Sequence, residues 1–295
     1  MSMLALLVEG VFHWGFSVRI VTESAGAQCY PYPPPSTLIG ALAYGMSSVS
    51  ELPECRLSAS GKRVSLVSSA AIVYTAVPWA AFAFSDATAV AGRSVAVGYS
   101  DFIRAFRLLY QRGARHTWEQ RDMWYGVNAH GKAYACGAGF KVIYLVDEEE
   151  LGKLGLTERG LLVAAYSIVR IGARESLVSV VSAEVSKDLE IIKGVDVKGS
   201  FETEFYFPSR LAEDVENAET IHLPKLDTRL WEFRPVEPVA LHDHEEFYVP
   251  SSYGFVLKPG KIIVRQLTGE GMLVNIRFGN GNVEKVVVPI EVVKP

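Results

Sequence analysis

The first fifty residues hold one long apolar run and one amphipathic segment, separated by a proline-rich stretch. Residues 4–12 are almost entirely apolar, which predicts a buried strand. The prolines Pro33–Pro35 favour an extended backbone, so a helix is expected to begin only after them. A helix over about 36–48 is predicted because its large apolar residues share one face at helical spacing: Leu38, Ile39, Leu42 and Met46.

Apolar patterns further along the chain predict five more elements. These are a strand over 63–75, a helix over 100–112, a strand over 141–146 closed by the acidic turn 147–150, a helix over 161–169 and a strand over 177–185. The helix over 100–112 depends on the spacing of Phe102, Phe106, Leu109 and Tyr110. The helix over 161–169 is opened by Thr157–Gly160 and ended by Gly172.

Together these elements predict an α+β fold built on a ferredoxin-like (RRM-type) domain. Without the helix over 100–112, their order is strand, helix, strand, strand, helix, strand, which is the order of that domain. We expect this domain to span 1–199, with a long insertion at about 76–135, and a β-rich region to follow over 200–295. In that region, Gly279–Asn282 lies between two apolar runs and predicts a β-hairpin turn rather than a loop that contacts RNA.

Charge is distributed unevenly along the 295 residues. The composition, 49% hydrophobic and 21% charged, is typical of a folded globular protein. Residues 1–146 carry 12 Lys/Arg against 8 Asp/Glu, whereas residues 147–295 carry 17 against 25, so the net charge of −4 hides a basic half and an acidic half. The basic half suits a polyanion, and the acidic half suits a basic protein neighbour.

Two features bear on the compartment. The three cysteines, Cys29, Cys55 and Cys136, form no CxxC pair, which argues against a zinc knuckle and favours a reducing cytoplasm. Residues 64–85 contain no charged side chain and are long enough to span a bilayer. Their serines and alternating β-branched residues favour two buried strands around Pro78 instead, and no membrane partner is expected.

The start of the helix over 36–48 is a candidate anion site. Ser36 or Thr37 is expected to cap the helix, because a hydroxyl there can accept a hydrogen bond from a free backbone N–H. An exposed helix N-terminus that carries two hydroxyls can hold a phosphate.

Two motifs in this part of the chain resemble a known family. The segment His13–Val18 (HWGFSV) and the segment Tyr30–Gly45 (YPYPPPSTLIGALAYG) resemble the CRISPR-associated Cas-five family in its archaeal type I-A form, and residues 170–177 give a looser match. The resemblance implies a member of the RAMP superfamily that binds the 5′ handle of the crRNA in a Cascade surveillance complex. It implies contact with the Cas-seven backbone subunit, which the protein would cap, and with the large and small subunits, and indirectly with the helicase-nuclease that the complex recruits. No cofactor and no catalytic role are expected.

An RNA-binding groove needs cations for phosphates and flat side chains for bases. Residues 99–125 supply five arginines and no lysine, interleaved with Tyr110, Trp118, Trp124 and Tyr125; a solvated arginine face is the alternative. The family resemblance adds the motif residues, although Arg170 and Arg174 could serve only as charges at a helix end. The predicted RNA-binding residues are His13, Trp14, Arg19, Ser36, Thr37, Arg104, Arg107, Arg112, Arg115, Arg121, Arg170 and Arg174, whereas Phe16 is expected in the core.

Three other functions stay open. A metal-independent ribonuclease that cuts CRISPR repeat RNA could use His13, His116 or His130 as a base, with Lys132 or Tyr125 nearby. A metal-dependent hydrolase could use His242, His244 and Glu246, which share a face on a strand, but one strand does not normally complete a metal site. A protein scaffold that never touches RNA is the third.

Overall fold

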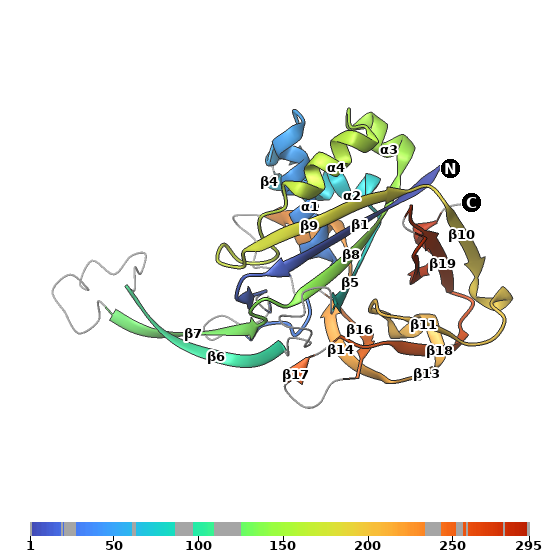
Figure 1. Ribbon diagram of the computed structural model, residues 1–295. Coiled ribbons are helices and arrows are strands. Elements are labelled where there is room, and N and C mark those ends of the chain that lie inside the picture. Colours follow the sequence, from blue (N-terminus) through green and yellow to red (C-terminus); the bar gives the residue numbers. More distant parts are fainter. Residues whose placement is uncertain are drawn as a thin grey trace.

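The computed structural model of the protein describes residues 2–18, 20, 28–60, 63–85, 97–108, 125–233, 243–251, 256–257, 259–279 and 281–293. A four-stranded antiparallel sheet forms its centre, with the strand order β5-β8-β1-β9 (Figure 1). These strands are β1 (Met3–Phe12), β5 (Trp79–Ser85), β8 (Gly139–Asp147) and β9 (Val178–Ser186). With α1 (Pro35–Val49) and α4 (Glu158–Tyr166), they follow the predicted order of strand, helix, strand, strand, helix, strand.

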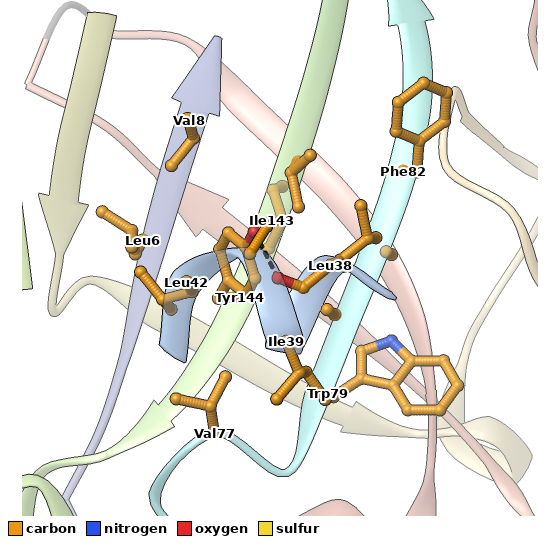
Figure 2. Packing of buried hydrophobic residues seen from close by; sticks show 14 of the residues in the cluster. Leu6, Val8, Leu38, Ile39, Leu42, Val77, Trp79, Phe82, Ile143 and Tyr144 are labelled. Carbon is orange, nitrogen blue, oxygen red and sulfur yellow. Dashed lines mark hydrogen bonds between the residues drawn. The ribbon is translucent and has the colours of Figure 1, made fainter. Parts of the chain in front are cut away.

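Both faces of the central sheet are covered along β1, β5 and β8, whose residues are mostly buried, whereas the edge strand β9 keeps exposed residues such as Val181. Helix α1 covers one face, where the Tyr144 hydroxyl donates to the Leu38 carbonyl oxygen at 3.1 Å (Figure 2). The opposite face meets a second antiparallel sheet in the order β10-β19-β20. Lys141 of β8 extends to this side and pairs with Glu284 of β20 at 2.8 Å and with Glu204 at 3.0 Å. The strands of the second sheet are β10 (Leu189–Lys193), β19 (Gly271–Arg277) and β20 (Val283–Pro289).

Helices α1 and α4 pack closely against each other at a glycine. A Cβ built on Gly45 would lie 2.9 Å from the Ala164 carbonyl carbon, closer than real Cβ atoms come. Helix α4 begins where the sequence predicts, because Thr157 Oγ1 accepts a hydrogen bond from the Gly160 N–H at 3.2 Å. It ends at Tyr166, before the predicted Gly172.

The predicted capping of α1 by a hydroxyl is wrong. Pro34 is the N-cap residue, Pro35 occupies the first turn, and no side chain caps the helix. The proline ring fixes a helical φ and has no N–H that needs a partner, so the helix begins two residues earlier than a hydroxyl cap would allow. The helix start is not exposed either: Pro33–Pro35 are buried, and the Tyr206 hydroxyl donates to the Pro33 carbonyl oxygen at 2.8 Å.

The predicted helix over 100–112 is also wrong, because a long β-hairpin occupies this part of the chain. Strands β6 (Val97–Leu108) and β7 (Tyr125–Tyr134) pair antiparallel and extend away from the body of the molecule (Figure 1). The short strands β17 (Val256–Leu257) and β2 (Gly15–Phe16) complete this sheet on either side. Aromatic and β-branched residues favour strands when a partner is available, and here pairing between strands outweighs helical spacing.

The uncharged stretch from 64 to 85 contains a helix instead of a continuous first strand. Strand β4 (Arg63–Ser68) ends at Ser68, whose hydroxyl accepts from the Ala70 N–H at 3.3 Å and so begins α2 (Ser69–Ala76). The second predicted strand, after Pro78, is confirmed as β5. No helix in the described part of the chain is long and apolar enough to cross a membrane. The acidic stretch after β8 also begins a short helix, α3 (Glu148–Lys153), which Asp147 caps.

The remaining elements are short strands and single helical turns, and most of them lie beyond residue 200, where short strands are expected. The strands are β3 (Cys55–Ser60), β11 (Phe201–Thr203), β12 (Phe207–Pro208), β13 (Ala212–Glu216), β14 (Ala218–Pro224), β15 (Glu232–Phe233), β16 (His244–Pro250) and β18 (Ile262–Leu267). The 3-10 turns are η2 (Gly194–Asp196), η3 (Ser209–Leu211), η4 (Thr228–Trp231) and η5 (Ile290–Val292). The predicted hairpin turn between β19 and β20 is confirmed, with Gly281 at φ +82°.

The largest buried cluster joins the central sheet to the β-rich region. Its members include Phe82 and Phe140 of the sheet together with Tyr206 and Phe247 from beyond residue 200. A second, smaller cluster lies wholly within the β-rich region, around Phe207 and Val264. The domain boundary near residue 200 stays a prediction.

Candidate nucleic-acid interface

The turn between β1 and β2 holds His13 and Trp14 at the protein surface. Phe12 and Phe16, on either side of the turn, are fully buried, as expected for Phe16. Gly15 has φ +139°, and a Cβ there would lie 2.8 Å from the Ala135 nitrogen, so only glycine fits this close approach to β7. The backbone of the turn is therefore fixed, and it presents the two side chains between its buried ends.

Trp14 is the centre of a cluster that three segments supply. Its Nε1–H donates to the Glu175 carbonyl oxygen, and Tyr134 meets its ring edge-on at a centroid distance of 6.1 Å. The Lys132 ammonium lies 4.7 Å from the ring centroid, and its Nζ is 3.6 Å from the Glu175 carboxylate. A cation and two flat side chains thus lie together on the surface.

The segment 170–177 packs against the turn through backbone contacts. Gly172 has φ +104°, the Ala173 N–H donates to the Ser17 carbonyl oxygen at 2.9 Å, and the Ser17 N–H donates to the buried Ser176 hydroxyl at 3.0 Å. These contacts hold the segment that carries Arg170 and Arg174 against the turn that carries Trp14.

Both arginines keep their charge free of carboxylates in the described part of the chain. The Arg170 guanidinium lies 5.3 Å from the centre of the Tyr44 ring on α1, and Arg174 is exposed. His13, also exposed, has its Nε2 2.7 Å from the Ser179 hydroxyl of β9. We call the surface formed by His13, Trp14, Lys132, Tyr134, Arg170, Arg174 and Glu175 the corner surface, because it lies at the corner of the central sheet where β1 ends and β9 begins.

Comparison with known proteins shows which family the chain belongs to. No protein-family model matches the chain. The chain is 25% identical to "CRISPR-associated protein Cas5 2" of Saccharolobus solfataricus over 272 residues, which are 91% of this chain and 90% of that protein. It is 32% identical to "CRISPR system aCascade subunit Cas5 1" of the same organism over 200 residues, which are 66% of this chain and 68% of that protein.

The chain belongs to the Cas5 family. A crystal structure of a CRISPR protein from Archaeoglobus fulgidus aligns with 97% of this Cas5 protein and 99% of its own chain, at 19% identity and a TM-score of 0.49. The two Saccharolobus solfataricus relatives confirm the Cas5 family that the two sequence motifs lead us to expect.

The Cas5 structure brings together four of the twelve predicted RNA-binding residues: His13, Trp14, Arg170 and Arg174. Ser36 and Thr37 are half-buried at the start of α1, about 12 Å along the helix axis from Tyr44. Arg104 and Arg107 lie on the strand β6 and not on the helix that the sequence predicts over 100–112. The other four predicted residues lie outside the described residues: Arg19, Arg112, Arg115 and Arg121.

Sequence reasoning missed Lys132, Tyr134 and Glu175 as part of this surface of the Cas5 protein. Lys132 and Tyr134 are two residues apart on β7, and they could have been found if 125–134 had been recognised as a strand. Glu175 uses its backbone oxygen and its carboxylate, and no sequence pattern reports a backbone contact of this kind.

The sequence offers two other candidate sites, the histidines His242 and His244 and the glycine-rich turn after β19. In each of them a described residue makes a polar contact within the protein. His244 Nε2 lies 2.7 Å from the buried Tyr30 hydroxyl, and His242 lies outside the described residues. Among the residues that the structure describes, no three His, Cys, Asp or Glu side chains form a group that could hold a metal ion. In the glycine-rich turn, the Gly279 N–H donates to the Glu184 carboxylate at 2.6 Å. A carboxylate that occupies this N–H disfavours a phosphate at the same place.

The proline-rich motif of this Cas5 protein is held by buried tyrosines. Burial raises the pKa of the Tyr206 hydroxyl well above its usual value, and burial raises the pKa of Tyr32 too. Both hydroxyls therefore stay neutral at physiological pH. The Tyr206 hydroxyl donates to the Pro33 carbonyl oxygen, so it helps to hold the proline-rich motif in place.

Proposed function

We propose that this Cas5 protein is a non-catalytic subunit of a type I-A CRISPR surveillance complex of the Cascade kind and binds the 5′ handle of the crRNA at the corner surface. The observation that carries the proposal is that this surface combines a lysine, two aromatic rings and two arginines that pair with no carboxylate among the described residues. Cations neutralise phosphates, and flat side chains stack on unpaired bases. The similar protein of Saccharolobus solfataricus named as an aCascade subunit supports membership of such a complex.

The central domain would be ferredoxin-like (RRM-type), which the strand order β5-β8-β1-β9 supports. In RRM domains the open sheet face stacks on RNA bases. Here the face opposite α1 is covered by β10, β19 and β20, and Lys141 is committed to Glu204 and Glu284 beneath them. RNA therefore meets the corner of the sheet rather than its face.

The proposed partners are those that the family resemblance implies, and the shape and the charge of the protein suit two of them. The β6–β7 hairpin would act as a thumb against the first Cas7 backbone subunit, which the protein would cap. The acidic half of the chain would face a basic neighbour, such as the large subunit, and the small subunit and the recruited helicase-nuclease would complete the set.

RNA binding is tested with end-labelled repeat-derived RNA in the presence of a chelator, run on native and denaturing gels together. We expect a shifted, intact RNA and a weaker shift for an unrelated sequence. Replacing Arg170 and Arg174 with alanine should lower the salt dependence of binding by about 0.7 per lost phosphate contact. Arg56→Ala is the matched control, because this exposed arginine lies on β3, outside the corner surface. An unchanged affinity and salt slope in the double variant would contradict the proposed interface.

A metal-independent ribonuclease is the second candidate, and the His13–Ser179 contact is what favours it. An exposed imidazole beside a hydroxyl can act as a general base. The same denaturing gel separates the two functions: a discrete cut that persists in chelator and disappears in His13→Ala would make the protein an RNA-processing enzyme.

A further inference from the structure

The ring of Trp14 is held in a fixed orientation although part of it faces solvent. Its indole N–H is committed to the Glu175 carbonyl oxygen, and Tyr134 packs against it with an interplanar angle of 64°. The half-buried Trp14 and the exposed Tyr134 leave aromatic surface open to solvent. A ring that is already oriented loses little freedom when another flat group stacks on it.

The group that lies over this ring is held weakly. Lys132 Nζ is 3.6 Å from the Glu175 carboxylate, whereas Lys187 and Lys261 approach their carboxylates to 2.7 Å and 3.0 Å. Half of the Glu175 side chain is exposed, so water competes for this ion pair. A cation over an indole near the surface is also a weak contact. Lys132 can therefore leave the ring at little cost.

We propose that one unpaired nucleobase of the RNA stacks on Trp14 in the position that the Lys132 ammonium holds in the free protein, while Lys132 turns to an adjacent phosphate. The inference rests on the proposed function and names the ligand group at the centre of the corner surface. In the free protein the Lys132 ammonium lies over the Trp14 ring and near the half-exposed Glu175 carboxylate. When RNA binds, the ammonium exchanges these two contacts for a phosphate of the RNA.

The charges around the ring favour a base over a phosphate at this position. The Glu175 carboxylate lies beside the ring and repels an anion there. Arg170 and Arg174, which carry no carboxylate in the described part of the chain, are available for the phosphates on either side of the base. A neutral flat group at the centre with anions at the edge matches a nucleotide whose base has left its stack.

A base-removal scan tests this inference. The probe is the repeat-derived RNA in which one base at a time is removed and the sugar–phosphate backbone is left intact. For the unchanged protein, one position should weaken binding about ten-fold when its base is missing. In Trp14→Leu the whole RNA should bind about ten-fold less tightly, and removal of the same base should have no further effect.

Two further variants keep the test independent of folding defects. Trp14→Phe retains a ring without the indole N–H and should keep the dependence on that base. Lys132→Met retains the aliphatic stem and should keep the dependence on the base but lower the salt slope.

The outcomes separate this inference from the proposed function. If the protein binds the RNA and no single base removal weakens binding, or if the sensitive position is equally sensitive in Trp14→Leu, the stacking site is refuted and RNA binding stands. If the protein binds no RNA at all, the inference and the proposed function fail together.

Discussion

Replacing Gly45 with alanine should push helices α1 and α4 apart. The new Cβ would lie 2.9 Å from the Ala164 carbonyl carbon and 3.3 Å from its Cα, whereas carbon atoms pack best at about 3.5–4.0 Å. The opposing atoms belong to a helix backbone and cannot rotate away, so one helix must move by about half an ångström or more.

The magnitude follows from two opposing terms. Overpacking of this kind costs about 1–3 kcal/mol, and the rigid backbone neighbour favours the upper half of that range. Alanine in a helix interior gains about 1 kcal/mol over glycine, so the net loss should be about 1–2 kcal/mol. Gly40 in the same helix is the matched control, because a Cβ there meets nothing within 4 Å. Gly40→Ala should stabilise the protein by about 0.5–1 kcal/mol.

Urea unfolding of the three proteins measures both effects. Gly45→Ala should lower the midpoint and Gly40→Ala should raise it, with the slope of the free energy against urea unchanged. If Gly45→Ala is as stable as Gly40→Ala, the close approach of α1 and α4 is refuted.

Three further predictions concern stability. Burial raises the pKa of Tyr144, so the stability that this residue contributes is complete below about pH 10 and falls above it by about 1.4 kcal/mol per pH unit. Above pH 10, the unfolding free energy of Tyr144→Phe should therefore fall less steeply with pH than that of the unchanged protein. An equal slope in the two proteins would contradict the burial of Tyr144. Lys141→Met should lower the free energy of unfolding by about 2–3 kcal/mol, because it leaves two partly buried carboxylates unpaired. Lys261→Met breaks an exposed ion pair and should lower it by less than about 0.5 kcal/mol. Equal losses in thermal unfolding of the two variants would refute this difference. Gly15→Ala should open the pairing of β2 with β7 and speed hydrogen exchange of the Ala135 amide, and unchanged protection would count against the tight turn.

The elements that local sequence could predict are those whose partners are close in the chain or whose pattern is unbroken. Helix α1 combines an N-terminal proline with apolar residues at helical spacing, and β8 is apolar along almost its whole length, so both were expected within a few residues. The β19–β20 hairpin carries its own turn signal in Gly281.

The β6–β7 hairpin could not be predicted in the same way. Its strands pair across a stretch of residues 109–124, and their regular form depends on a partner that is absent from any short window of sequence. Helical spacing of Phe102 and Phe106 was therefore misleading. At the start of α1, the same window offered a hydroxyl cap and a proline start, and sequence alone does not say which one the fold uses.

Some residues of the corner surface could be predicted from the sequence, and others could not. His13 and Trp14 stand in a motif of six residues, so the sequence pointed to them directly. Lys132 and Glu175 reach Trp14 from segments more than a hundred residues away, and one of these contacts is made by a backbone oxygen. Long-range contacts of this kind leave no trace in local composition.

Photo-crosslinking of the intact protein to end-labelled repeat-derived RNA, followed by identification of the crosslinked peptides, shows where the RNA lies on the protein. We expect crosslinks in the peptides that carry His13 and Trp14, Lys132 and Tyr134, or Arg170 and Arg174. Crosslinks confined to the strands of the β-rich region, β11 to β20, would contradict RNA binding at the corner surface.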